Sequence, residues 1–219
     1  MSQEPADPKR LVQHGYDRIA ERYGEWAASV RGDERERYAS VLFQTPMHGA
    51  RVLELGCGPG SAVTVELADR FRLIAVDVST AQLQIARTRA PAADVLLADM
   101  ATLEFAPRSF DAVVAFYSII HLPREEHAGL LCRIATWLRP GGMLVATMGA
   151  RSTEAGYDAD WLGAPMFWSH FDSDTNRRLV EEAGLKLVTA REETADEHGR
   201  PATFLWIVAQ APVRLPGGR

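Results

Sequence analysis

The stretch Val52–Gly60, VLELGCGPG, places three glycines within five residues directly after an apolar run. Glycine adopts positive φ without strain and has no Cβ, so a ligand can approach the backbone closely at such a turn. A helical pattern over 61–70 follows, and the first turn of a helix offers free N–H groups. In open α/β sheets, ligands bind beyond the carboxyl ends of the strands. The stretch therefore predicts a ligand site at the end of a strand over 51–55.

Short apolar runs and helical patterns alternate along the chain after this turn. Such alternation is typical of right-handed βαβ units and of a mostly parallel sheet covered on both faces. The last two apolar runs flank a charged, glycine-containing link and predict an antiparallel pair. The expected fold is therefore α/β: a doubly wound, Rossmann-like, mostly parallel seven-stranded sheet with a C-terminal antiparallel hairpin. The predicted strands are 51–55, 72–77, 94–98, 110–117, 143–148, 186–190 and 203–210, and the predicted helices are 11–30, 34–45, 61–70, 80–89, 124–138 and 173–183.

The length of 219 residues, with 47% apolar composition, suffices for one domain with a full core. Between the fifth and sixth predicted strands, an aromatic-rich segment interrupts the alternation; we expect it to be a connection that forms a lid. Both ends of the chain are polar and are expected to be tails without chemistry. The expected segments of the single domain 1–219 are a tail over 1–9, an N-terminal helical cap over 11–45, a core over 50–150, the lid over 151–171, a closing helix and strands over 172–211, and a tail over 212–219.

Charge, hydropathy and cysteine content narrow the class of protein. The net charge of −5 argues against a surface built to neutralise phosphates, so no nucleic-acid partner is expected. No apolar run approaches the roughly 20 residues that span a bilayer, so no membrane partner is expected either. Cys57 and Cys132 lie in a glycine turn and an apolar helical pattern, which favours reduced thiols over a disulfide. Together these features indicate a soluble cytoplasmic protein, and its scarce lysine beside abundant arginine and alanine is typical of a GC-rich bacterial genome.

The spacing of the glycines distinguishes two kinds of ligand. The dinucleotide fingerprint G-x-G-x-x-G would place its third small residue at Ser61, whereas here Gly60 comes one position earlier. Glu54 also lies directly before the turn, where a carboxylate would repel a pyrophosphate. A cationic or zwitterionic ligand would be attracted by the same carboxylate. The pattern therefore disfavours a nicotinamide dehydrogenase, although it does not exclude one.

The turn and four further motifs resemble class I S-adenosylmethionine-dependent methyltransferases. LIAVDVS ends a strand on Asp77, which the resemblance assigns to the ribose hydroxyls of the cofactor, and VLLADM ends on Asp99 and Met100, which it assigns to the adenine. FDAVVAFYSIIHL and LRPGGMLVATMG resemble the fourth and fifth strands with their turns. The resemblance covers about residues 50–150 and implies S-adenosylmethionine as cofactor.

We expect the cofactor site to include one aromatic residue of the N-terminal helix and the carboxyl ends of the first four strands. Two assignments have structural alternatives. Asp99 could instead close an ordinary Asx turn. Phe116 and Tyr117 could both pack on the sheet, and strand alternation requires only one of them to face the site. The candidate cofactor-binding residues are Tyr23, Glu54, Gly56, Cys57, Gly58, Gly60, Asp77, Val78, Gln82, Asp99, Met100 and Phe116.

The acceptor is expected between the N-terminal helix and the segment YDADWLGAPMFWSHF over 157–171. This segment concentrates apolar surface after the fifth strand, where a pocket or lid would lie over the carboxyl ends. The alternative is a satellite core, and the aromatic stripe of the helix could likewise be ordinary packing. The candidate substrate-binding residues are Tyr16, Trp26, Tyr117, Ser118, Trp161, Met166, Phe167 and Trp168.

Methyl transfer from a sulfonium is an in-line displacement, so alignment and desolvation supply most of the catalysis and no metal is required. A general base is useful when the acceptor must lose a proton, and histidine has a suitable pKa. His121, after the fourth strand, and His170, in the aromatic segment, are the candidate catalytic residues. His121 could alternatively cap the helix that begins near Pro123.

These observations favour an enzyme that transfers a methyl group from S-adenosylmethionine to an O, N or C atom of a small organic acceptor. The small acceptor is favoured because the chain has no added nucleic-acid module and no basic stripe. Methylation of protein or RNA is the alternative within the same class. A non-catalytic adaptor that keeps the cofactor fold is the alternative from another class.

Overall fold

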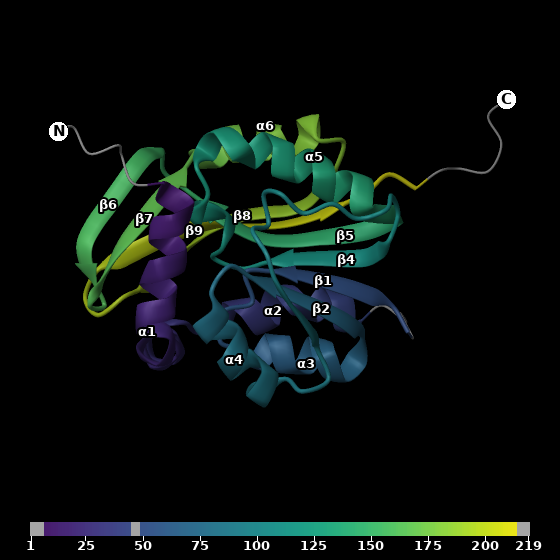
Figure 1. Cartoon of the computed structure of the whole chain (residues 1–219). Helices are drawn as coiled ribbons and strands as arrows, with labels where there is room; N and C mark the ends of the chain where they lie inside the picture. The colour runs from purple at the N-terminus through teal and green to yellow at the C-terminus, as the bar shows by residue number, and fades with distance from the viewer. Residues whose placement is uncertain (1–6, 45–48, 214–219) are drawn as a thin grey trace, which may run out of the picture.

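The computed structural model describes residues 7–44 and 49–213 and contains a seven-stranded sheet in the order β3-β2-β1-β4-β5-β9-β8 (Figure 1). The first five strands of the sheet run parallel, and β9 is antiparallel to both β5 and β8. This confirms the predicted fold class. The strands of this sheet are β1 (Arg51–Leu55), β2 (Arg72–Asp77), β3 (Asp94–Leu97), β4 (Phe110–Ala115), β5 (Leu138–Gly149), β8 (Lys186–Asp196) and β9 (Pro201–Gln210).

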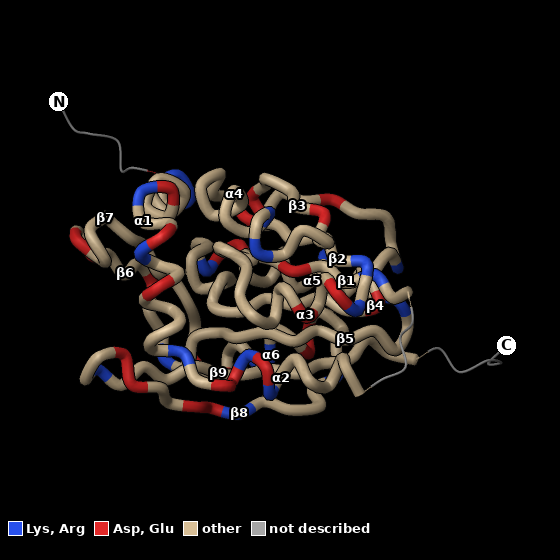
Figure 2. Tube along the Cα trace, turned by 90° about the horizontal axis from the view of Figure 1, so that it is seen from below, with Lys and Arg blue, Asp and Glu red and all other residues tan. Residues whose placement is uncertain are grey.

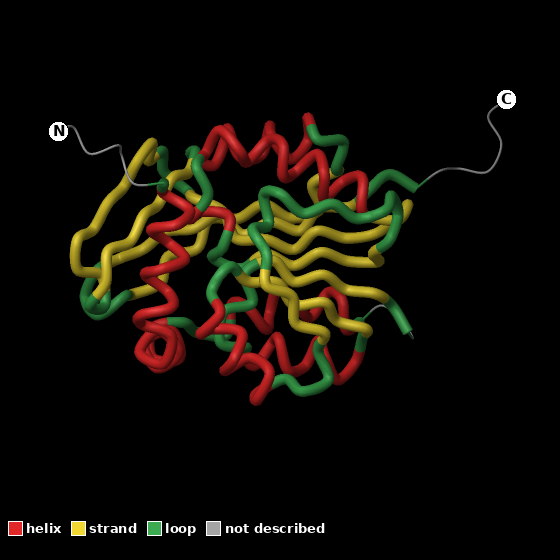
Figure 3. The backbone as a smooth tube through the Cα atoms, viewed as in Figure 1, coloured by secondary structure: helices red, strands yellow, loops and turns green. Residues whose placement is uncertain are grey.

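Helices cover both faces of the sheet, as Figure 3 shows. One face packs against α5 and α6 and the other against α2, α3 and α4, each through its own hydrophobic cluster (Figure 1). A third cluster lies apart from the sheet and is formed by α1 and by residues 161–168. The helices are α1 (Pro8–Val30), α2 (Glu34–Phe43), α3 (Ala62–Arg70), α4 (Thr80–Arg89), α5 (His127–Trp137) and α6 (Ser173–Glu182), and 3₁₀ turns span Ile119–His121 and Arg124–Glu126.

Side-chain caps position the helices that surround the glycine turn. Ser61 and Thr64 form a reciprocal capping box at the start of α3, which satisfies two otherwise free N–H groups. At the start of α4, Asp17 of α1 accepts hydrogen bonds from the Ser79 hydroxyl at 2.7 Å and from the Ala81 N–H at 3.1 Å. This cap fastens α1 across the carboxyl ends of the strands.

The aromatic segment is a β-hairpin rather than the irregular connection that the sequence predicts. It consists of β6 (Thr153–Trp161) and β7 (Ala164–His170), and we call it the aromatic hairpin. Leu162 and Gly163, the two residues between the strands, both have positive φ, as the commonest two-residue hairpin turns require. The sequence hides this turn because it lacks the usual Asn-Gly or Asp-Gly pair. The hairpin packs against α1 through the third hydrophobic cluster (Figure 1).

The N-terminal helix begins earlier than predicted, so the expectation of a tail over 1–9 is wrong at its end. Pro8 occupies the first turn of α1, and the Asp7 side chain accepts a hydrogen bond from the Lys9 N–H at 3.0 Å. An acidic cap and a proline in the first turn are favourable helix starts, and they bring Lys9 into the fold. Residues 1–6, 45–48 and 214–219, including parts of both predicted tails and of the helix predicted over 34–45, lie outside the described residues.

Charged residues of both signs are interspersed over the described chain, for example along β8 (Figure 2). Basic residues do not form a continuous stripe in the described ranges (Figure 2). No helix within residues 7–44 or 49–213 is long and apolar enough to cross a membrane.

Candidate active site

The glycine turn after β1 is clamped onto the end of β2. The N–H groups of Gly56 and Cys57 donate to the carbonyl of Val76 at 2.8 and 2.9 Å, and the Gly58 N–H donates to Asp77 Oδ2 at 2.9 Å. All three glycines of the turn have positive φ. At Gly56 a Cβ would also overlap the Cβ of Ser118, so both conformation and space require glycine there.

Asp77 ends β2 with its carboxylate facing the turn. Its Oδ1 accepts from the Ser79 N–H at 2.9 Å, so each oxygen already holds one backbone donor. Only 9% of the residue is exposed, and burial raises the pKa of Asp77 to about 6, although backbone hydrogen bonds oppose the shift. A carboxylate oxygen has two lone pairs, so each oxygen can accept a further hydrogen bond from a ligand.

Asp77 lines the first of three connected pockets, which we call the sheet pocket. The pocket runs along the carboxyl ends of β1, β2 and β4 and is walled on the other side by α1. Of the cofactor-binding residues predicted from the sequence, it includes Tyr23, Gly56, Gly58, Asp77, Val78, Asp99, Met100 and Phe116.

Asp99 closes an Asx turn, which was one of the two possibilities in the sequence, and it also lines the sheet pocket. In this turn its Oδ1 accepts from the Ala101 N–H at 2.8 Å. Its Oδ2 lies 2.8 Å from Lys9 Nζ, and Lys9 also contacts Glu126 at 3.0 Å. Sequence reasoning missed Lys9 because it assigned the residue to the tail.

The second pocket, which we call the glycine pocket, lies on the other side of the turn and holds a carboxylate with a free oxygen. Glu54 is 4% exposed; its Oε1 accepts from the Thr64 hydroxyl at 3.0 Å, and its Oε2 has no partner among the described residues. Burial raises the pKa of Glu54 to about 7. The pocket is also lined by Cys57, Gly58 and Gly60, and by Arg31 and Arg35, which sequence reasoning missed.

A buried carboxylate oxygen and the Arg35 guanidinium in one pocket match a ligand with both an ammonium and a carboxylate. The thiol of Cys57 does not contribute charge here, because burial raises its pKa well above the ordinary value. Both Cys57 and Cys132 are free thiols. No group of three or more His, Cys, Asp or Glu side chains within the described ranges is placed to hold a metal ion.

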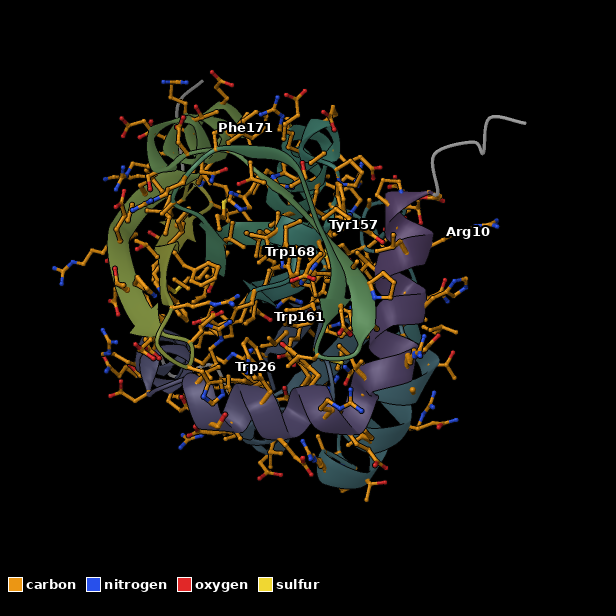
Figure 4. The ribbon with its side chains drawn as sticks, turned by 90° about the vertical axis from the view of Figure 1, so that its left-hand side faces the viewer. Arg10, Trp26, Tyr157, Trp161, Trp168 and Phe171 are labelled. Atoms are coloured by element: carbon orange, nitrogen blue, oxygen red, sulfur yellow. The ribbon has the colours of Figure 1, made fainter. Side chains whose placement is uncertain are left out.

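The third pocket, which we call the aromatic pocket, lies between α1, the aromatic hairpin and the loop after β4. Trp26, Trp161 and Trp168 lie near one another in its wall (Figure 4), with ring centroids 5.3 Å apart for Trp26 and Trp161 and 5.5 Å for Trp161 and Trp168. Tyr23 lines all three pockets. The three pockets therefore converge on one ring, close to the glycine turn.

Tyr117 shows why strand alternation failed as a guide after β4. Phe116 lines the sheet and glycine pockets, and Tyr117 lines the sheet and aromatic pockets, so both face the site. Tyr117 has φ of 54°, a left-handed conformation that is unusual for an aromatic residue. This turn away from the strand geometry redirects its ring toward the aromatic pocket.

His121 and Tyr16 form a hydrogen-bonded pair at the boundary of the sheet and aromatic pockets. His121 Nδ1 lies 2.8 Å from the carbonyl of Phe167, which can only accept, so Nδ1 carries the proton. His121 Nε2 is then an acceptor for the Tyr16 hydroxyl, which lies 2.8 Å away. Burial lowers the pKa of His121 to about 4, so the imidazole is neutral. The alternative role as a cap for α5 is not observed, because His121 ends a 3₁₀ turn before that helix.

His170 lies in the wall of the aromatic pocket but outside this pair. Its Nδ1 lies 2.5 Å from the carbonyl of Arg151, and burial lowers the pKa of His170. Its ring is therefore oriented by the backbone of the link between β5 and β6.

Four predicted site residues do not face the expected pocket. Met166 and Phe167 pack with α1 in the third hydrophobic cluster and line neither the sheet nor the aromatic pocket, because their side chains fasten the hairpin to the helix. Ser118 donates its hydroxyl to the carbonyl of Leu55 at 2.6 Å and lines the sheet pocket, not the aromatic one. Gln82 is fully buried in the first turn of α4 and lines none of the three pockets.

Comparison with known proteins finds a methyltransferase domain in the middle of the chain. A family model described as a methyltransferase domain matches residues 52–142. Trans-aconitate 2-methyltransferase of Paracidovorax citrulli is 39% identical over 122 residues, covering 53% of this chain and 46% of that protein. O-methyltransferase rstn1 of Aspergillus nomiae is 31% identical over 147 residues, covering 63% of this chain and 57% of that protein. The chain thus spans about half the length of the curated relatives it matches.

Solved structures share the fold. That of Burkholderia thailandensis 1,6-didemethyltoxoflavin-N1-methyltransferase, with bound 1,6-didemethyltoxoflavin and S-adenosylhomocysteine, aligns with a TM-score of 0.71 at 15% identity. The alignment covers 97% of this chain and 93% of that one. The domain match and the curated relatives show that about half of this chain is similar in sequence to methyltransferases, and the solved structure shows that the chain shares the fold of one.

Proposed function

We propose that the chain acts as one methyltransferase domain that transfers a methyl group from S-adenosylmethionine to a small organic acceptor by in-line displacement. The observation that carries this proposal is the convergence of three pockets on Tyr23. The sheet pocket fits the adenosine end of the cofactor, and the glycine pocket fits its amino-acid end. The aromatic pocket opens beside the place where these two pockets meet. The names of the trans-aconitate and O-methyltransferase relatives support a small acceptor.

In this proposal the cofactor extends from the sheet pocket into the glycine pocket. Asp77 accepts hydrogen bonds from the ribose hydroxyls, and Asp99 and Met100 contact the adenine. The free Oε2 of Glu54 accepts from the ammonium, and Arg35 pairs with the carboxylate. When bound, the cofactor supplies the methyl group on a sulfonium, which the face of the Tyr23 ring attracts.

The Tyr16–His121 pair is the proposed route for a proton that leaves the acceptor. The Tyr16 hydroxyl donates to His121 Nε2, so its oxygen lone pairs remain available to accept from an acceptor O–H or N–H. His121 can then take the Tyr16 proton at Nε2 while its Nδ1–H stays on the carbonyl of Phe167. Among the described residues, His170 does not form a hydrogen bond with Tyr16. We therefore propose that His121 is the base and that His170 forms part of the wall of the acceptor pocket.

Removing either member of the pair is expected to slow methyl transfer without weakening cofactor binding. Tyr16→Phe and His121→Ala should each lower kcat by about 10²–10⁴-fold, the usual contribution of a positioned general base. Because the two groups act together, the double variant should lose little more than the worse single variant. The measurement is steady-state turnover beside calorimetry of S-adenosylhomocysteine. Full turnover in the His121→Ala variant would remove His121 from the mechanism.

Cofactor affinity is expected to fall in mild acid. The pKa of Glu54 is raised to about 7, so the carboxyl is ionised above that pH and takes up a proton below it. Ionised Glu54 is the form that pairs with an ammonium, so affinity is present above about pH 7 and lost as the pH falls, by about tenfold from pH 7.5 to pH 6. Asp77, with a pKa of about 6, adds to the loss below that pH. Glu54→Gln should weaken binding and flatten the upper part of this profile; calorimetry that finds the same slope in both proteins contradicts the assignment.

Three alternatives are separated by simple experiments. Thermal-shift measurements with S-adenosylhomocysteine and with NAD distinguish a methyltransferase from a nicotinamide dehydrogenase. An adaptor would bind S-adenosylhomocysteine without turnover on any acceptor. Turnover on metabolite extracts freed of macromolecules would count against a protein or RNA acceptor.

We also propose a cytoplasmic location, which the free thiols Cys57 and Cys132 support.

A further inference from the structure

Flat apolar surfaces form most of the aromatic pocket. Trp26 comes from α1 and Trp161 and Trp168 from the hairpin, and their rings meet nearly edge to face, with interplanar angles of 77° and 89°. Figure 4 labels these three side chains together with Tyr157 of the same hairpin, which is exposed and does not line the pocket. The pocket holds about 160 Å³ of free space, which is small beside the roughly 300–1,000 Å³ of ordinary small-molecule sites and limits its occupant to a small molecule.

The charged groups of this pocket neutralise one another. Arg31 Nη1 lies 2.5 Å from Glu197 Oε1, and the two side chains are only 10% and 22% exposed. The Arg31 guanidinium also lies over the rings of Tyr117, at 4.1 Å, and Trp26, at 5.1 Å. The pocket therefore has its one Arg already paired, and the rings of Trp26 and Tyr117 already hold a cation.

The remaining titratable groups of the wall do not add charge. Burial lowers the pKa of both His121 and His170, so both rings are neutral. Burial also raises the pKa of Tyr117 to about 12 and that of Tyr16 well above its ordinary value, so both phenols keep their protons. A carboxylate would find no free cation in this pocket, and an ammonium would find no free carboxylate, because Arg31 and Glu197 pair with one another.

We propose that the acceptor is an uncharged, planar aromatic molecule with a ring hydroxyl or ring N–H. Its ring packs among Trp26, Trp161 and Trp168, and its O–H or N–H donates to the Tyr16 oxygen at the boundary with the sheet pocket. This inference rests on the proposed function and names the acceptor class for it. The Arg31–Glu197 pair is the specificity determinant that keeps carboxylates out.

The reaction balances within this arrangement. A lone pair of the acceptor O or N forms a bond to the methyl carbon, the bond from that carbon to sulfur breaks, and its electron pair stays on sulfur. The acceptor proton passes to the Tyr16 oxygen while the Tyr16 proton passes to His121 Nε2, and water later removes it. The sulfonium charge disappears as the imidazolium charge forms, so the total charge of the site is conserved during the step.

The first experiment uses the pocket tryptophans as reporters. The full chain, saturated with S-adenosylhomocysteine, is titrated with 2-naphthol, tyramine and trans-aconitate at neutral pH, and tryptophan fluorescence is recorded. We expect saturable quenching with 2-naphthol at a Kd at least about tenfold lower than with either charged probe. Trp161→Leu should raise the Kd for 2-naphthol by about tenfold and leave the affinity for S-adenosylhomocysteine within about twofold.

Tyr157→Ala is the matched control, because Tyr157 is an aromatic residue of the same hairpin that is 62% exposed and lies outside the aromatic pocket. It should leave both affinities unchanged. Equal loss in the Trp161 and Tyr157 variants would overturn the proposal, since the effect would then be one of hairpin stability. Tighter binding of trans-aconitate or tyramine than of 2-naphthol would overturn it as well.

The second experiment tests the ion pair with Glu197→Gln, which leaves Arg31 without its carboxylate. The preference for 2-naphthol over 6-hydroxy-2-naphthoate should fall by about tenfold, because the freed guanidinium can pair with the added carboxylate. An unchanged preference contradicts the role given to the pair. Failure of the wild-type chain to bind S-adenosylhomocysteine would overturn the proposed function and this inference together, whereas binding of S-adenosylhomocysteine with no preference for the neutral aromatic probe overturns the inference alone.

Discussion

Replacing Asp77 with alanine is expected to lower the affinity for S-adenosylhomocysteine by about a hundredfold or more. In the proposed complex the Asp77 carboxylate accepts the ribose hydroxyls, and hydrogen bonds to a charged group contribute about 1.5–3 kcal/mol each. The same carboxylate accepts from Gly58 and Ser79, so its loss also loosens the turn that the cofactor contacts. Calorimetry on the purified variant measures the loss.

Two further variants make this result specific. Asp77→Asn keeps the shape but replaces one acceptor oxygen with a donor that faces another N–H, so it should also lose at least about tenfold in affinity. Asp94→Asn alters an exposed carboxylate at the amino end of the neighbouring strand β3, away from the carboxyl ends that line the pockets. This variant should bind S-adenosylhomocysteine normally. Urea unfolding without ligand shows whether each variant is folded. Unchanged affinity in a folded Asp77→Ala variant would sink the ribose assignment.

Replacing Gly56 with alanine is expected to lower the free energy of unfolding by roughly 2–5 kcal/mol. Gly56 has φ of 74°, which costs any residue with a Cβ, and the added methyl would overlap the Cβ of Ser118. Relief by moving the turn would displace the N–H groups that bond to Val76. Urea unfolding measures the destabilisation, and calorimetry should find cofactor binding weakened with it.

Gly184→Ala separates the two causes, because Gly184 has φ of 89° but nothing within 4 Å of an added Cβ. Its cost should be only the backbone part, about 1–2 kcal/mol. Adding Ser118→Gly to Gly56→Ala removes the clashing Cβ and should recover the steric part, as a double-mutant cycle would show. Equal destabilisation at Gly56 and Gly184 would mean that contact with Ser118 is unimportant.

The sequence predicted the position of a residue where that position depends on its immediate neighbours in the chain. Glu54 and Asp77 lie at the carboxyl ends of two strands of a βαβ unit, and parallel strands place these ends at one edge. Both residues line pockets at that edge, while their contacts with a cofactor stay a prediction. His121 was also found from its place after a strand, but its partner Tyr16 lies 105 residues earlier, so the pairing could not be read from the pattern.

The sequence failed where a structure depends on distant contacts or on an uncommon turn. The aromatic hairpin has a Leu-Gly turn, which is not a usual hairpin signal, and it is held in position by packing on α1. Neither feature can be recognised in the sequence, so the segment was predicted as a connection. Lys9 was assigned to the tail because its ion-pair partner Asp99 lies 90 positions later in the chain and gives no local signal. Arg31 gains its role from Glu197, which lies in the link between β8 and β9.

By itself, the sequence determined the fold class and the first five parallel strands, because each βαβ unit is a local pattern. The glycine spacing with Glu54 disfavoured a dinucleotide, and the resemblance to methyltransferases indicated the methyl donor. Only the tertiary structure decided which side chains surround the proposed acceptor pocket. The aromatic pocket is assembled from α1, the loop after β4, the aromatic hairpin and the β8–β9 link, so its shape and charge depend on long-range packing. The neutrality of the pocket is likewise a tertiary property, since Arg31 and Glu197 cancel one another only when residues 166 positions apart meet.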